Sequence, residues 1–271
     1  MSQVIRLANR RWLQIFVIGL ALFIATEQAL KFTANPNYFP TVILLGALLI
    51  PVTFVAYVYE HVPAREVSLS LLIICFFGGG IVGLLAAGLL EYSSLVNLGI
   101  ASLLLVGLIE EGAKIILPAA QFINGKYQSE ADGLLFGVAA GMGFAALETM
   151  GYGMVALIQT QGSIGTLEEV LLVRGFLSPA GHGAWTGLVC AVLWRERSKK
   201  KTFSWPLLGT FLLAILLHTL WNVFNGPSAT SLIYLIGDAA VAIVSLAFLI
   251  RRMHEAVKQR ALDYPGQSEE G

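Results

Sequence analysis

The stretch Leu108-Ile-Glu-Glu-Gly-Ala-Lys114 places two adjacent carboxylates and an amine inside an otherwise apolar run, Leu95–Pro118. A charge at the centre of a bilayer costs about 2.5–3.5 kcal/mol on insertion scales, so such residues usually mark a functional site. Glu110 and Lys114, four residues apart on a helix, can neutralise each other. Glu111 then needs another partner, and the candidates at similar predicted membrane depth are Glu148, His182, His218 and Asn222.

The composition around this stretch indicates a polytopic membrane protein. Of the 271 residues, 56% are hydrophobic and only 13% are charged, whereas soluble domains carry about 25% charged residues. The formal net charge is zero, which gives no support for nucleic-acid binding. Cys75 and Cys190 lie in apolar runs, so we expect core packing and neither a disulfide framework nor a cysteine metal motif. The first apolar run is too long for a cleavable signal peptide, and we expect it to remain as a transmembrane helix.

The spacing of the apolar runs predicts an all-α fold with about eight transmembrane helices, since about 20 apolar residues cross the hydrocarbon layer. No linker is long enough to separate domains, so we expect residues 1–271 to form a single transmembrane domain, with the chemical motifs in 96–225. The predicted helices cover residues 12–32, 40–60, 68–90, 96–120, 131–158, 173–195, 206–225 and 229–251.

The basic residues predict the orientation, because cytoplasmic loops carry an excess of Lys and Arg. With eight helices, the non-cytoplasmic side receives only Lys31 and Arg174, and Lys114 lies within the membrane. Both termini are therefore expected in the cytoplasm, and a bacterial cytoplasmic membrane is the expected location. The cytoplasmic side receives Arg6, Arg10, Arg11, Arg65, Lys126, Arg195, Arg197, Lys199, Lys200, Lys201, Arg251, Arg252, Lys258 and Arg260.

Three later helices carry the remaining polar residues. The helix expected at 131–158 has a stripe of small residues at Gly133, Gly137 and Gly141, which allows close packing of helix backbones in lipid. Glu148 follows on the same helix. The next two helices share a short echo, His182-Gly-Ala-Trp-Thr and His218-Thr-Leu-Trp-Asn, in which a tryptophan follows each histidine by three residues.

These polar residues are predicted to share one buried level. At 1.5 Å per residue, Glu111, Glu148, His182 and His218 lie about 13–26 Å from the predicted cytoplasmic surface. Two histidines and a glutamate would complete a catalytic zinc site with one position open for water. A further glutamate could accept a proton, and the Asn222 amide could stabilise an oxyanion. A metal-free alternative is that glutamate and histidine activate water directly, with His218 and Asn222 binding the oxyanion.

Four short motifs resemble those of the PrsW-type intramembrane proteases, which are related to the CAAX prenyl endopeptidases. Glu110-Glu111-Gly-Ala-Lys114 matches Glu-Glu-x-x-Lys, and Phe144-Ala-Ala-Leu-Glu148 matches Phe-x-x-x-Glu. The settings of His182 and His218 resemble the histidine motifs that follow in those families. Two departures stand out: Asn222 occupies a position where many PrsW-type sequences have Asp, and His182 is followed by Thr186 and not by an acid.

The resemblance implies an endopeptidase that cleaves membrane-anchored proteins, such as anti-sigma factors in bacteria, within the lipid bilayer. It implies catalytic roles for Glu110 and Glu111, and metal-binding or water-activating roles for Glu148, His182 and His218. Zinc or another divalent metal is the implied cofactor.

Two other functions are compatible with the same residues. A proton- or metal-coupled transporter could use the intramembrane carboxylates and histidines as a relay, although the chain shows no pair of matched halves or broken helices of the transporter kind. A non-catalytic scaffold could keep the polar residues for packing alone.

Overall fold

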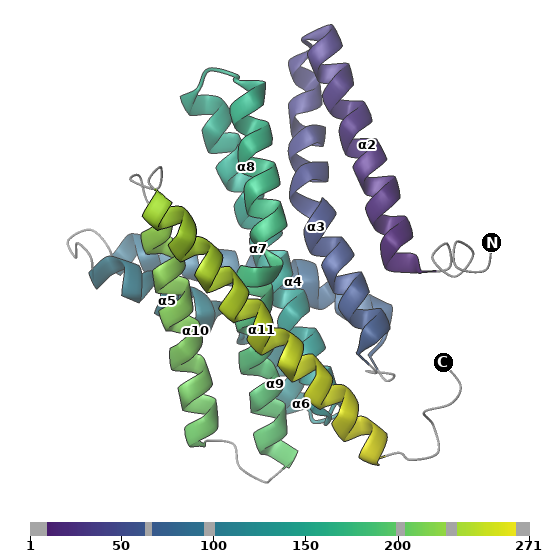
Figure 1. Cartoon of the computed structure of the whole chain (residues 1–271), viewed down its shortest axis with the longest axis vertical. Helices are drawn as coiled ribbons and strands as arrows, with labels where there is room; N and C mark the ends of the chain where they lie inside the picture. The colour runs from purple at the N-terminus through teal and green to yellow at the C-terminus, as the bar shows by residue number, and fades with distance from the viewer. Residues whose placement is uncertain (1–9, 63–66, 95–100, 199–203, 226–231, 264–271) are drawn as a thin grey trace. The chain divides into compact units, whose positions relative to one another are not determined.

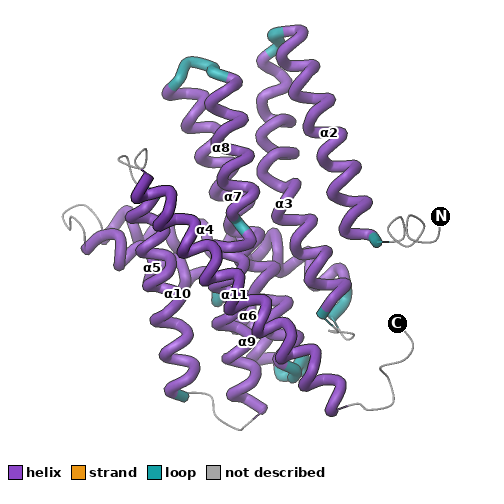
Figure 2. Tube along the Cα trace, viewed as in Figure 1, coloured by secondary structure: helices purple, strands orange, loops and turns teal. Residues whose placement is uncertain are grey.

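The computed structural model describes residues 10–62, 67–94, 101–198, 204–225 and 232–263, and these residues form helices and no strand (Figures 1 and 2). The all-α polytopic membrane fold expected from the sequence is confirmed. In chain order the elements are α2 (Arg11–Thr33), the 3-10 helix η1 (Pro36–Tyr38), α3 (Phe39–His61), α4 (Leu69–Ser94), α5 (Ala101–Lys114), α6 (Ile116–Asn124), α7 (Glu130–Gln159), α8 (Ile164–Leu177), the π-helical turn η2 (Pro179–Gly183), α9 (Ala184–Ser198), α10 (Trp205–Phe224) and α11 (Leu232–Asp263).

Seven helical stretches of the described chain are long and apolar enough to cross a membrane, one fewer than predicted. The difference lies at 96–120, where the described residues form two short helices, α5 and α6. Ile115 separates them but keeps right-handed helical angles (φ −79°, ψ −15°), and the Ala119 amide donates to its carbonyl at 2.7 Å. Neither helix alone is long enough to cross a membrane, since α5 has 14 residues and α6 has 9. The segment also carries the charges of Glu110, Glu111 and Lys114.

The helix predicted at 173–195 is also interrupted. Helix α8 ends at Leu177, α9 begins at Ala184, and the turn η2 between them contains Gly181 with non-helical angles (φ −98°, ψ −112°). The predicted bounds lie within the candidate span 164–197 but miss its first residues, because α8 begins at Ile164. The break was not predicted, because hydropathy reports how long a segment is and not how its backbone turns.

The described chain divides into two compact units. Unit 1 comprises residues 1–61 and 145–179, and unit 2 comprises residues 62–144 and 180–271. In unit 1, α2 packs on α3 and α3 packs on α8. Gly46 permits this approach, because a Cβ atom there would lie 2.9 Å from both Leu171 and Phe23. The buried core of unit 1 contains Phe23, Leu30, Val42, Ile43, Ala47, Leu157, Leu167 and Leu171.

In unit 2, the glycine stripe of α7 brings two helix backbones together. A Cβ atom on Gly137 would lie 2.5 Å from the Thr186 carbonyl oxygen, and one on Gly141 would lie 2.2 Å from the His182 carbonyl oxygen. Real side chains cannot approach so closely, so only glycine fits at these positions. The close packing predicted from the stripe is confirmed, and it sets the position of His182 against α7.

Candidate metal and catalytic site

Helix α5 supplies two carboxylates and an ammonium group to the interior of unit 2. Glu111 and Lys114 have no exposed surface, and Glu110 is 7% exposed. Lys114 Nζ lies 3.0 Å from Glu110 Oε2 and 2.9 Å from Glu111 Oε1. The four- and three-residue spacings place all three side chains on one helix face, where the ammonium group reaches both carboxylates.

The turn η2 presents His182 to the same ammonium group. His182 Nδ1 lies 2.7 Å from Lys114 Nζ, and the histidine is buried. The non-helical backbone angles of Gly181 kink the chain directly before this histidine. The turn lies between the end of α8 at Leu177 and the start of α9 at Ala184.

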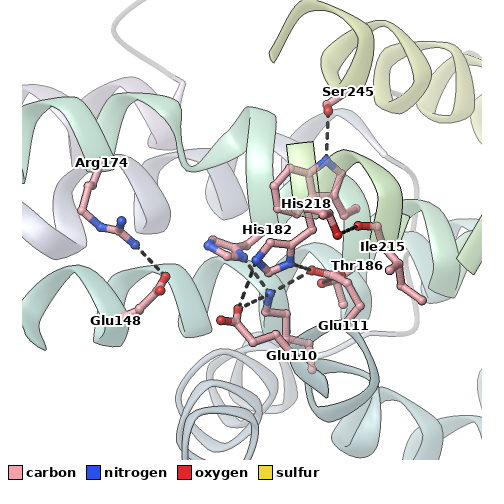
Figure 3. A network of polar contacts seen from close by, with 12 residues as sticks. Glu110, Glu111, Glu148, Arg174, His182, Thr186, Ile215, His218 and Ser245 are labelled. Atoms are coloured by element: carbon pink, nitrogen blue, oxygen red, sulfur yellow. Dashed lines mark hydrogen bonds and ion pairs between the residues drawn. The ribbon is translucent and has the colours of Figure 1, made fainter. Parts of the chain in front are cut away.

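Helix α10 brings His218 to the two glutamates. Its Nδ1 lies 2.8 Å from Glu111 Oε1, and its Nε2 lies 3.6 Å from Glu110 Oε2 (Figure 3). Gly107 lets α5 approach α10 closely, because a Cβ atom there would lie 3.2 Å from the Ile215 carbonyl oxygen. Three segments far apart in the sequence therefore meet at one buried polar cluster.

Aromatic rings surround the two imidazoles. Trp185 stacks on His218, with ring centroids 4.9 Å apart and an interplanar angle of 26°, and its edge meets His182 at 5.5 Å. Phe144 lies 5.4 Å from the His182 ring and faces Lys114 Nζ at 4.3 Å. Such surroundings exclude bulk water and strengthen the electrostatic interactions of the charged groups.

Three residues of the cluster could hold a metal ion. Glu110, His182 and His218 are all buried, and each offers a ligand atom within 4.8 Å of the other two. Two imidazoles and a carboxylate form a known ligand set of catalytic zinc sites. The donor chemistry, burial and spacing of these residues therefore fit a divalent metal ion.

Glu111 lies beside this group and not within it. Its Oε1 contacts His218 and Lys114, and its Oε2 accepts a hydrogen bond from the Thr186 hydroxyl at 3.4 Å. A carboxylate that holds the second nitrogen of a ligating histidine fixes the orientation of the ring. The two adjacent glutamates, which the sequence could not distinguish, thus have different surroundings.

Two further predicted site residues lie outside the three-residue group. Glu148 belongs to unit 1, where its carboxylate pairs with Arg174 at 2.7 Å, and Arg174 also covers the Tyr152 ring at 3.9 Å. Asn222 follows His218 by one turn of α10 and is half-buried. The metal role of Glu148 and the catalytic role of Asn222 stay predictions.

Sequence reasoning did not identify two residues that support the site. Trp185 is fully buried, and its indole N–H donates to Ser245 Oγ at 2.9 Å. The repeated spacing of histidine and tryptophan in two helices was the available signal for Trp185. In the structure the tryptophans of the two repeats are in contact, since Trp185 meets Trp221 edge-on with ring centroids 5.9 Å apart. No sequence pattern indicated Ser245, since it is a single serine in an apolar stretch of α11 (Leu232–Asp263).

Comparison with known proteins supplies an independent finding. The model of a family described as PrsW family intramembrane metalloprotease matches residues 67–251. This segment contains both glutamates of α5, both histidines and the aromatic residues around them. Searches of curated proteins and of solved structures gave no match.

Proposed function

Since the chain belongs to the PrsW family of intramembrane metalloproteases, we propose that it hydrolyses peptide bonds of membrane-anchored proteins at the buried cluster of unit 2. The observation that carries this proposal is the meeting of Glu110, His182 and His218 within 4.8 Å of one another. An anti-sigma factor or a similar single-span protein is the proposed kind of substrate, and a bacterial cytoplasmic membrane the proposed location.

Glu110, His182 and His218 would hold the metal ion, with zinc as the first candidate. When bound, the ion would supply Lewis acidity and make water a nucleophile at neutral pH. Glu111 would orient His218 by accepting a hydrogen bond from Nδ1 at 2.8 Å. Asn222 is proposed as the amide donor to the oxyanion that develops on the scissile carbonyl.

Burial of the cluster serves this chemistry. The rings of Phe144 and Trp185 limit the access of water, so that fixed donors and charges act on the substrate in a medium of low dielectric constant. Lys114 balances part of the negative charge of the two glutamates. Removal of either glutamate or either histidine should therefore affect the reaction strongly.

The test is cleavage of single-span peptides by the purified chain, with and without a chelator. Glu110→Gln, His182→Ala and His218→Ala should each lower the rate by about 100-fold or more, as the loss of a central catalytic group does. Glu168→Gln is a matched control, because this glutamate also pairs with a lysine, Lys31, but lies in unit 1. Its rate should stay at the wild-type level.

The outcomes separate the competing functions. Loss of cleavage on chelation, restored by zinc, supports the metal-dependent form, and cleavage that resists thorough chelation supports direct activation of water by glutamate and histidine. Wild-type rates in all three variants would overturn the proposed site. Proton or metal flux in liposomes that is abolished by Glu148→Ala, with no cleavage, would favour the transporter.

A further inference from the structure

Lys114 contacts two of the three residues that could hold a metal ion. Its ammonium nitrogen lies 3.0 Å from Glu110 Oε2 and 2.7 Å from His182 Nδ1, and it has no exposed surface. Glu111, at 2.9 Å, is a third acceptor. An ammonium group has three protons to donate, which matches these three acceptors.

The contact with His182 involves the lone pair that a metal ion would use. An ammonium group has no acceptor, so in this hydrogen bond Nδ1 must accept, and the ring proton is then carried by Nε2. A neutral imidazole in this tautomer has one free lone pair, on Nδ1. The ammonium group and a metal ion bound through Nδ1 therefore require the same electron pair.

From this geometry we infer that Lys114 is an internal cation that competes with the metal ion for its ligands. The inference rests on the metal site proposed above. Metal binding requires the ammonium group to leave His182, and Glu111, which is outside the metal-ligating group, can retain it. When the metal is absent, Lys114 supplies positive charge beside two buried carboxylates that would otherwise be uncompensated.

The experiment measures zinc affinity of the full-length chain in detergent, by competition with a chromophoric chelator after removal of bound metal. Lys114→Met should bind zinc about tenfold or more tightly than the wild type, a gain similar in size to the 10–100-fold losses that follow removal of groups supporting metal ligands. Its metal-free form should unfold at a lower temperature than the wild type, and zinc should raise that temperature by more than it does in the wild type.

A second pair of variants keeps the inference testable if Lys114→Met alone fails to fold. Glu111→Gln with Lys114→Met removes one negative and one positive charge together, and it should bind zinc more tightly than Glu111→Gln alone. Lys31→Met is the matched control, because Lys31 also pairs with two glutamates, Glu27 and Glu168, in unit 1. Its zinc affinity should equal that of the wild type.

The failures of the two proposals are distinguishable. If His182→Ala loses zinc but neither Lys114 variant binds it more tightly than its reference, the competition is overturned and the metal site stands. If His182→Ala and His218→Ala bind zinc as the wild type does, the metal site is overturned, and the competition with it.

Discussion

His218 faces a different carboxylate at each ring nitrogen, and the two distances assign different roles to the neighbouring glutamates. Nδ1 lies 2.8 Å from Glu111, within hydrogen-bonding range, whereas Nε2 lies 3.6 Å from Glu110, beyond it. A proton shared between Nδ1 and Glu111 leaves the Nε2 lone pair directed towards Glu110. That is the arrangement in which one glutamate orients the histidine and the other joins it as a ligand.

This division of roles predicts unequal losses of metal affinity. Glu111→Ala should weaken zinc binding about 10–100-fold, the usual effect of removing a group that orients a ligand. Glu110→Ala, which removes a ligand, should weaken it further. Equilibrium dialysis against buffered zinc measures both. Retention of full affinity in Glu110→Ala together with its loss in Glu111→Ala would reverse the assignment.

The hydrogen bond between the Trp185 indole and Ser245 leads to a prediction about protein stability. Ser245→Ala leaves the buried Nε1–H without its acceptor at 2.9 Å. This should destabilise the protein by about 0.6 kcal/mol, the average for hydrogen bonds between membrane helices, and by no more than about 1.7 kcal/mol. Trp185→Phe with Ser245→Ala removes both partners and should recover part of this loss. Thermal unfolding of both variants and of Trp185→Phe closes the double-mutant cycle. Equal losses in the presence and absence of Trp185 would show that the hydrogen bond contributes nothing.

The glutamates of the cluster and Ser245 differ in how readily their importance can be predicted from sequence. Charged groups in apolar runs are conspicuous, so Glu110, Glu111, His182 and His218 could be selected without a structure. Ser245 could not, because a serine is common in membrane helices and its partner is 60 positions away. The pairing of Glu148 with Arg174 was not predicted either, since the arginine was considered only as a charge on the non-cytoplasmic side.

At the level of helices, α7 acts as the surface against which the histidine turn is set. A Cβ atom on Gly141 would lie 2.2 Å from the His182 carbonyl oxygen, which is backbone and cannot rotate aside. The only relief is for η2 and α9 to move away from α7. Such a movement would displace the histidine from Lys114 and from the other ligating residues.

Gly141→Ala should therefore lower both stability and activity. Overpacking of a tight interface costs about 1–3 kcal/mol, and the cleavage rate should fall because His182 is displaced. Gly151→Ala is the control on the same helix, because a Cβ atom there meets nothing within 4 Å. It should be neutral or stabilising by up to about 1 kcal/mol, as glycine is a poor helix former. Thermal unfolding and the peptide assay measure the two effects, and equal behaviour of both variants would contradict the role given to α7.

The same helices show where reasoning from sequence reaches its limit. The period of four in Gly133, Gly137 and Gly141 predicted a close helix contact, because the signal is local to one helix. The kinked turn at Pro179–Gly183 was not predicted. Its proline and glycine residues indicate a possible break in the helix, but the long apolar run led to the prediction of one continuous helix.

At the scale of the whole molecule, the number of membrane crossings determines which loops share a side. Seven described stretches qualify as spans by themselves. The eighth would be α5 and α6 together, which continue through Ile115 in helical conformation and both pack on α4. The charges that make this segment less apolar are buried inside unit 2, so lipid need not meet them. If this segment crosses the membrane, 14 of the 17 Lys and Arg residues lie on one side, as the charge rule expects.

Two exposed positions distinguish eight crossings from seven. Gln128 precedes α7, and Gln161 follows it. If Arg10 faces the cytoplasm and α5–α6 crosses, a cysteine at 128 is cytoplasmic and one at 161 is external; without that crossing the two are exchanged. Cys75 and Cys190 are buried and should stay unlabelled. In intact cells, an impermeant maleimide should therefore label Gln161→Cys and spare Gln128→Cys, with Asn37→Cys as the positive control that is external in both arrangements. Labelling at 128 with protection at 161 would mean that α5–α6 enters the membrane without crossing it, and the basic residues near Lys258 would then lie outside, against the charge rule.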